Sequence, residues 1–258
     1  MQKYFSNFYK YKDLMFEMIQ KDIKLKYRNS VLGLLWSVLN PLMFMLVLTV
    51  IFSELFSTTI EHFAIYVLSG RLIYACFSET TNFAMQSIVS NAALIKKIYV
   101  PKYFFPLSRV CSSFINSLLS MISIIPVMLF SGLHFSWTNL MFIFPLFYLL
   151  LFSIGVGLIL STIYVFFRDM QHIYSLALVI VMYASAIFYP VDIIPDKIMP
   201  LIQLNPIFLI VQMFRSALIY GSPSALSNHL FCLGYASILI FVGLYTFYKK
   251  QDKFIFYL

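Results

Sequence analysis

The sequence predicts an all-α membrane protein with six transmembrane helices, an amphipathic N-terminal helix at the membrane interface and a re-entrant outer helix pair before the last span. The 258 residues are 61% hydrophobic and only 11% charged, whereas about a quarter of the residues are charged in typical soluble domains. Apolar blocks long enough to cross a ~30 Å hydrocarbon core recur along the chain. Fifteen of the eighteen Lys and Arg residues fall in alternate gaps between these blocks, at residues 3–28, 96–109, 168 and 249–253.

The sorting of basic residues predicts the orientation of the chain. Cytoplasmic loops collect Lys and Arg, so both termini are expected in the cytoplasm. The gaps around His62 and His134 hold no Lys or Arg and are expected outside. Arg71, Lys197 and Arg215 fall outside this rule. The net charge of +8 follows from the same sorting, so we expect no nucleic-acid binding.

The first element, residues 1–30, is predicted to be an amphipathic interfacial helix. Its charged residues recur at helical spacing and form one polar stripe, made of Lys3, Lys10, Asp13, Glu17, Lys21, Lys24 and Arg28. Apolar residues such as Met15 and Ile19 make the opposite face. A helix with one charged and one apolar face lies on a bilayer rather than crossing it.

Residues 31–258 are predicted to form a single transmembrane domain. Six apolar blocks predict its spans, at about residues 31–56, 63–89, 106–133, 140–166, 173–189 and 230–248. Many aromatic side chains, which make up 19% of the chain, lie near the expected membrane surfaces. In the fourth block Ser153, Gly157 and Ser161 repeat every four residues, and small residues at that spacing let helices pack closely.

Residues 191–224 are predicted to enter the membrane from outside and return. The segment is apolar, but Pro195, Pro200, Pro206 and Pro223 interrupt it, and its longest uninterrupted part is too short for an easy crossing. A full crossing would also place the C-terminal lysines outside. Non-helical backbone at that depth must be covered by protein or line a wet cavity, which places the segment beside a transport path. An interfacial loop on lipid headgroups is the alternative.

The sequence predicts a transport subunit rather than an enzyme. None of the eight glycines begins a G-x-x-x-x-G-K-[ST] phosphate-binding loop. The four histidines and three cysteines follow no metal or disulfide spacing, and no nucleophile–base constellation stands out. We therefore expect no cofactor or metal on this chain. Active transport would draw its energy from a partner or an ion gradient.

Three charged residues fall inside or near the first two predicted spans: Glu54, Arg71 and Glu79. Charges at membrane depth are usually paired and often functional. Arg71 and Glu79 are two helical turns apart, roughly 12 Å along the axis, so direct pairing between them is strained. Pairing of Arg71 with Glu54 across the hairpin is favoured, and a proton relay is the alternative.

Five segments of the chain carry a pattern in a fixed order. They are residues 22–42 (DIKLKYRNSVLGLLWSVLNPL), 91–108 (NAALIKKIYVPKYFFPLS), 166–169 (FFRD), 188–190 (FYP) and 204–206 (LNP). Together they resemble the ABC-2 type permeases that export bacterial surface polysaccharides, including the O-antigen and teichoic acid exporters. One departure follows Gly70, where many relatives carry an apolar residue and then Pro-Trp. This chain has Arg71, Leu72, Ile73 and Tyr74 there.

The resemblance implies a homodimer in a bacterial inner membrane, paired with two copies of a separate ATPase subunit that holds ATP and Mg²⁺. The substrate would be a lipid-linked glycan such as the O-antigen of lipopolysaccharide. Residues 91–105 would be the coupling loop that docks into the ATPase, with contacts from Ile95, Lys96, Lys97, Tyr99, Val100, Pro101 and Lys102. Tyr27 and Arg28 would lie at the cytoplasmic entrance, where a lipid-linked pyrophosphate can pair with Arg. Contact with anionic phospholipid is the alternative. Arg168 and Asp169 would tie the turn between two helices.

Glycan export also suggests a use for aromatic side chains in the first and fifth spans. Flat rings stack on sugar faces, and the candidates to line a channel are Phe44, Phe52, Tyr174, Tyr183 and Phe188. Packing or lipid contact is the alternative for each. For the whole chain, three other functions stay open: an ABC-2 exporter of a drug or small lipid, a gradient-driven flippase of lipid-linked sugars, and a membrane-embedded transferase.

Overall fold

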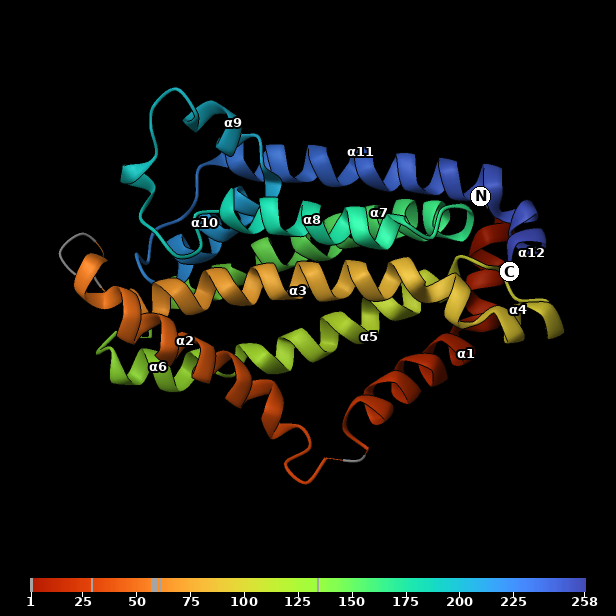
Figure 1. Ribbon diagram of the computed structural model, residues 1–258, viewed down its shortest axis with the longest axis horizontal. Helices are drawn as coiled ribbons and strands as arrows, with labels where there is room; N and C mark the ends of the chain where they lie inside the picture. Colours follow the sequence, from red (N-terminus) through yellow and green to blue (C-terminus); the bar gives the residue numbers. More distant parts are fainter. Residues whose placement is uncertain (1, 29, 57–59, 61, 134) are drawn as a thin grey trace.

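The computed structural model describes residues 2–28, 30–56, 60, 62–133 and 135–258, without the side chains of residues 2–10 and 53–56. These ranges are built from α-helices and short 3-10 turns, and no strand occurs in them. Figure 1 shows the long helices running side by side along one axis of the molecule. The predicted all-α class is confirmed.

The centre of the bundle is formed by α3 (Phe63–Ser90), α5 (Phe104–Met121) and α7 (Ile143–Phe166). Residues such as Ile73, Met85 and Leu149 are completely buried between them. The small residues of the fourth predicted span lie inside this packing. A Cβ placed on Gly157 would come within 2.8 Å of the Ala84 Cβ, so the glycine is needed for α7 to approach α3 this closely.

The last long helix, α11 (Leu226–Lys250), packs along α7. Two glycines permit their contact: a Cβ on Gly155 would lie 2.7 Å from the backbone carbon of Leu239, and one on Gly243 would lie 2.8 Å from the carbonyl oxygen of Gly155. Neither backbone can yield without separating the helices, so this crossing depends on the absence of side chains.

The N-terminal helix α1 (Gln2–Tyr27) packs against α5 rather than entering the bundle. Its apolar side chains Leu14, Met15 and Met18 rest on a hydrophobic cluster at one end of the molecule. Farther along, the Asp22 carboxylate forms an ion pair with Arg109 of α5 at 3.0 Å. α1 therefore follows the predicted amphipathic pattern, with the apolar face inward.

The next helix, α2 (Leu35–Phe56), has most of its apolar side chains exposed. The third predicted span is broken near Ser123 into α5 and α6 (Ile124–Phe130). The fourth begins as the 3-10 turn η1 (Trp137–Phe142) and continues directly into α7. These differences from the predicted bounds amount to a few residues at each end.

The fifth predicted span is shorter than its apolar block suggests. The helix α8 (Met170–Tyr183) has 14 residues and ends six residues before Tyr189. Ala186, with a φ of 47°, cannot continue a right-handed helix. The chain then passes through η2 (Val191–Ile193), α9 (Met199–Gln203) and α10 (Pro206–Leu218).

Within the described residues, four stretches are long and apolar enough to cross a membrane: Leu35–Phe52, Phe104–Phe130, Trp137–Phe166 and Leu226–Tyr257. α3 is long, but its charged and hydroxyl side chains lower its hydropathy, and α8 and α10 are shorter apolar helices. Both chain ends lie at the same end of the molecule as α4 (Ala92–Lys97) and α12 (Phe254–Tyr257), as Figure 1 shows. The opposite end carries α6, α9 and α10.

Candidate functional site

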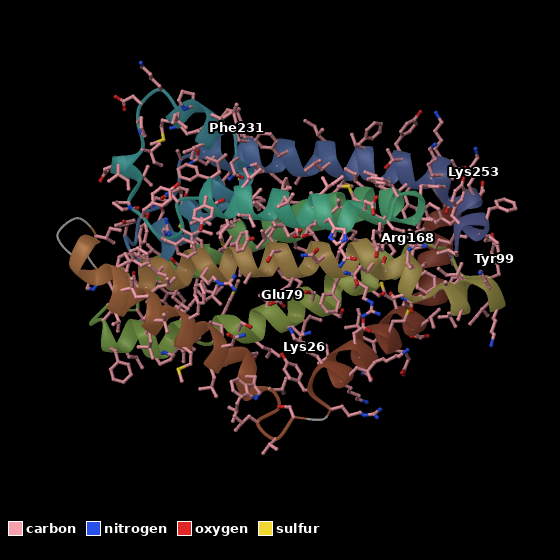
Figure 2. The ribbon with its side chains drawn as sticks, viewed as in Figure 1. Lys26, Glu79, Tyr99, Arg168, Phe231 and Lys253 are labelled. Atoms are coloured by element: carbon pink, nitrogen blue, oxygen red, sulfur yellow. The ribbon has the colours of Figure 1, made fainter. Side chains whose placement is uncertain are left out.

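The segment from α4 to the start of α5 forms an exposed projection at the end that carries both termini. Ile95 and Val100 are 8% and 9% exposed and anchor the segment in the bundle. Between them Lys96, Lys97 and Tyr99 point away from the bundle, with Tyr99 91% exposed. Figure 2 shows Tyr99 at the extremity of the molecule. Four consecutive exposed residues, 96–99, between two buried ones thus present a short basic and aromatic surface on a fixed base.

Two hydrogen bonds hold this projection from behind. The Tyr11 hydroxyl donates to the carbonyl oxygen of Tyr99 at 3.4 Å. The Lys102 ammonium donates to the carbonyl oxygen of Gln251 at 2.7 Å, in the short 3-10 turn η3 (Gln251–Lys253). Burial lowers the pKa of Lys102, and the charge of Asp252 opposes that shift. Lys102 therefore faces the C-terminal segment, unlike Lys96 and Lys97.

A hydrophobic cluster ties the projection to the two ends of the chain. Its completely buried rings are Phe104 at the start of α5 and Phe254 in α12. Phe254 lies edge-on to Phe247 at 5.2 Å between ring centroids. Packed side chains therefore connect the projection to α5 and α11.

The turn between α7 and α8 joins the same cluster. Arg168 stacks on the Tyr164 ring at 5.3 Å and donates to the carbonyl oxygen of Tyr257 at 3.3 Å. The carbonyl oxygen of Asp169 accepts from the backbone nitrogens of His172 and Ile173, while the Asp169 side chain is exposed. Arg168 thus fastens the turn to the C-terminus, and Asp169 contributes through its backbone.

A cavity of about 190 Å³ lies among α1, α2, α3 and α5. Lys26 and Glu79 form an ion pair at 3.3 Å on its lining, with side chains 39% and 48% exposed; Figure 2 shows the two residues close together. The Tyr27 hydroxyl also lines it and is buried with no described hydrogen-bond partner. Of the two predicted entrance residues, Tyr27 lines the cavity, whereas Arg28 is exposed and is not among the lining residues.

Arg71 lines the same cavity from α3. Its guanidinium stacks on the Phe44 ring at 4.8 Å and lies 5.9 Å from the Tyr74 ring centroid. Among the described side chains Glu79 pairs with Lys26 and not with Arg71. The side chain of Glu54 lies outside the described residues, so its pairing with Arg71 stays a prediction.

A second cavity, of about 240 Å³, adjoins the first and shares Lys26 with it. Asp22 and Arg109 line it, and Ser112 donates to the Asp22 carboxylate at 3.3 Å. Burial raises the pKa of Asp22, and the Arg109 charge together with the Ser112 hydrogen bond opposes that rise. The two cavities together present Lys26, Arg71 and Arg109 against Asp22 and Glu79, an excess of one positive charge.

The aromatic residues proposed for a channel occupy different environments. Phe44 lines the first cavity, and its ring lies 6.4 Å from that of Phe188. Phe52 and Phe188 are partly buried against a small apolar cluster. Tyr174 is 7% exposed and donates its hydroxyl to Thr81 at 2.6 Å, while Tyr183 is 58% exposed. Only Phe44 of this set faces a described cavity.

Two functional candidates were missed by reasoning from the sequence. Lys26 falls off the polar stripe of the first helix and was not predicted to be a site residue, although it lines both cavities. Arg215 was noted only as an exception to the charge rule, and it is a completely buried arginine in α10. That exception was the available signal. Among the described residues no group of three His, Cys, Asp or Glu side chains could hold a metal ion.

A helical bundle in which four stretches are long and apolar enough to cross a membrane is typical of a membrane protein. Residues 13–219 match the ABC-2 type transporter family, and the chain belongs to that family. The predicted identity of an ABC-2 type permease subunit, rather than an enzyme, is thereby confirmed.

Relatives match this chain over nearly their full length. The O-antigen export system permease protein RfbA of Klebsiella pneumoniae is 30% identical, covering 94% of this chain and 93% of its own. The protein of the same name from Myxococcus xanthus is 28% identical, with 95% of each chain covered. The polysialic acid transport protein KpsM of Escherichia coli is 23% identical over 90% of this chain and 91% of its own.

Proposed function

We propose that this chain is the transmembrane permease subunit of an ATP-driven exporter that moves a lipid-linked polysaccharide out of the cytoplasm. The observation that carries the proposal is the end-to-end similarity to permeases named for O-antigen export. Another relative is named for the transport of polysialic acid. An exporter of a drug or small lipid, or a gradient-driven flippase, lacks comparable support.

The proposed topology has six spans in a bacterial inner membrane with both termini in the cytoplasm. Four long apolar helices supply four of them, and α3 and α8 supply the others. The clustering of both termini with α4 at one end agrees with the sorting of Lys and Arg into those segments. α9 and α10 then form a re-entrant pair on the outer side, since a full crossing there would place the C-terminal lysines outside.

The proposed partner is an ABC ATPase, two copies of which would bind a homodimer of this chain and supply ATP and Mg²⁺. The exposed surface of Lys96, Lys97 and Tyr99 would dock into it, while Ile95 and Val100 hold the base. Lys102 would brace the segment from inside through Gln251.

The charged cavity near the end of α1 is the proposed entrance for the lipid-linked pyrophosphate. The Lys26–Glu79 pair is largely exposed, and exposed pairs contribute only about 0–1 kcal/mol. An arriving pyrophosphate could therefore replace Glu79 as the partner of Lys26 at little cost. Arg71 and the Tyr27 hydroxyl lie on the same cavity and can add hydrogen bonds.

Affinity purification from native membranes tests the partner first. A co-purifying subunit with a phosphate-binding loop in equal amount supports the ABC exporter, and its absence under several mild detergents contradicts it. In the purified complex, Lys96→Glu with Lys97→Glu, or Pro101→Gly, should leave ATP hydrolysis and membrane insertion intact while abolishing export. Export that survives both changes would refute the coupling assignment.

The entrance is tested by reconstituting the complex with a lipid-linked oligosaccharide pyrophosphate and measuring its stimulation of ATP hydrolysis. Lys26→Met should raise the half-saturating substrate concentration about tenfold, by loss of one charge-assisted hydrogen bond of about 1.5 kcal/mol. Lys24→Met serves as the control, because Lys24 is exposed on the same helix and does not line either cavity. If the half-saturating substrate concentration is the same for Lys26→Met and Lys24→Met, Lys26 does not bind the substrate at the entrance.

A further inference from the structure

Arg215 is completely buried near the end of α10. Its guanidinium donates hydrogen bonds to three backbone carbonyl oxygens, those of Ala186 at 3.0 Å, Ile187 at 3.1 Å and Tyr66 at 3.1 Å. No ion pair with a carboxylate is found for it among the described residues. A buried charge without a counter-charge is costly, so the groups packed around the guanidinium must offset that cost.

The arginine joins three elements that are far apart in the sequence: α10, α3 and residues 184–190. It lies over the Tyr66 ring of α3 at 3.4 Å. The Tyr66 hydroxyl in turn donates to the carbonyl oxygen of Tyr189 at 3.0 Å. Gly70, one turn farther along α3, makes room for the guanidinium, because a Cβ there would lie 2.7 Å from the Arg215 Nη2.

The other end of α10 is fastened to the same residues. The Asn205 side chain accepts a hydrogen bond from the Ile207 nitrogen and so caps the start of α10. Its amide nitrogen donates to the Ala184 carbonyl oxygen at 3.2 Å and to the Ser185 hydroxyl at 3.0 Å. Residues 184–190 are therefore hydrogen-bonded to side chains at both ends of α10. Arg215 also donates a hydrogen bond to α3, through the carbonyl oxygen of Tyr66.

We propose that Arg215, seated on Tyr66, is the latch that holds the outer re-entrant segment shut against α3 between transport cycles. The latch rests on the outer segment being the gate of the proposed permease. In the closed state the guanidinium is dry, hydrogen-bonded to three carbonyl oxygens and stacked on the Tyr66 ring. When the path opens, the guanidinium loses its three hydrogen bonds to carbonyl oxygens. Water then hydrates the charge, and this solvation offsets the lost bonds. This balance gives the segment two discrete arrangements.

The test uses the purified permease–ATPase complex in proteoliposomes loaded with potassium, without nucleotide, and records potassium efflux with an electrode. Two variants release the latch from opposite sides: Arg215→Met removes the donors, and Gly70→Ala pushes a Cβ into the guanidinium. Each has a matched control. Lys197→Met removes an exposed cation from the same outer segment, and Gly234→Ala adds a Cβ that meets nothing within 4 Å.

We expect efflux at least tenfold above wild type for Arg215→Met and Gly70→Ala, and wild-type efflux for both controls. Tyr66→Phe, which keeps the ring but loses the bond to Tyr189, should leak less than either. If Arg215→Met fails to assemble with the ATPase, the other two variants decide. If none of the three leaks, the latch is wrong and Arg215 is a structural anchor.

Efflux in this assay needs no glycan and no ATP, so its result does not depend on the cargo. A leak with no glycan-stimulated ATP hydrolysis would leave the latch in place and overturn the proposed substrate. If the variants do not leak but the glycan still stimulates ATP hydrolysis, the latch is overturned and the proposed substrate stands.

Discussion

Truncation of Phe254 should release the C-terminal segment from the exposed projection between α4 and α5. The Phe254 side chain is completely buried, with its ring 5.2 Å from Phe247 and 5.7 Å from Phe166. Replacing a fully buried Phe by Ala costs about 3–5 kcal/mol. Two residues along the same short helix, Phe256 is 85% exposed, and exposed substitutions usually change stability by about 0.5 kcal/mol or less. The two variants therefore remove the same type of side chain, one from a buried position and one from an exposed position.

Trypsin cleavage after Lys253 measures the release, because the protease must bind an extended chain. Where local opening is fast, cleavage follows the population of the open form. Since each 1.4 kcal/mol is a factor of ten, a loss of ~3 kcal/mol should speed cleavage of Phe254→Ala by roughly a hundredfold. Phe256→Ala should be cleaved at nearly the wild-type rate.

The functional consequence follows from the bond between Lys102 and Gln251. With the C-terminal segment released, the base of the projection loses its brace. If the projection couples to the ATPase as proposed, export should fall while ATP hydrolysis continues. Equal cleavage rates for the two phenylalanine variants would refute the packing argument. Faster cleavage with normal export would refute the link to coupling.

Three further predictions follow from close contacts. Gly155→Ala should destabilise the chain by about 1–3 kcal/mol through overpacking against α11. Gly234→Ala should not, because the space around Gly234 is open. Thermal unfolding of the two purified variants compares them directly. Asp22→Ala removes the partner of the partly buried Arg109 and should weaken the packing of α1 on α5 by about 1–3 kcal/mol. Amide hydrogen exchange in residues 12–27 should become faster. Unchanged exchange would show that the Asp22–Arg109 ion pair does not hold α1 on α5. Asn205→Ala should lower stability by about 0.5–2 kcal/mol through loss of the cap on α10, and a thermal midpoint equal to wild type would show that the cap contributes nothing.

Helix positions were predictable because they depend on the local chain. The apolar blocks placed α2, α3, α7 and α11 within a few residues of their observed bounds, since a long apolar run in lipid must satisfy its own backbone hydrogen bonds. α8 ended early because the residues that follow it are held in a non-helical path by hydrogen bonds from Tyr66, Asn205 and Arg215. Those partners are distant in the sequence, and no local pattern reports them.

In the candidate site, too, some features were predictable from the local sequence and others depended on distant residues. Exposure of Lys96 and Lys97 was predictable from their position in a basic loop. The inward turn of Lys102 was not, because it depends on the Gln251 carbonyl, 149 residues away in the sequence. Arg71 could be recognised as unusual from its place in an apolar block, but its stacking on Phe44 required the packing of α2 on α3.

By itself the sequence determined the class of the protein, the approximate helices, the segments in which charge collects and the membership of the ABC-2 type transporter family. Each of these follows from residue type and order, which act through solvation and through short-range backbone geometry. Only the tertiary structure decided which charges meet, which glycines lie at helix crossings and where Arg215 is bound. Those outcomes depend on contacts between segments far apart in the chain, whose distances are set by the packing of the whole bundle.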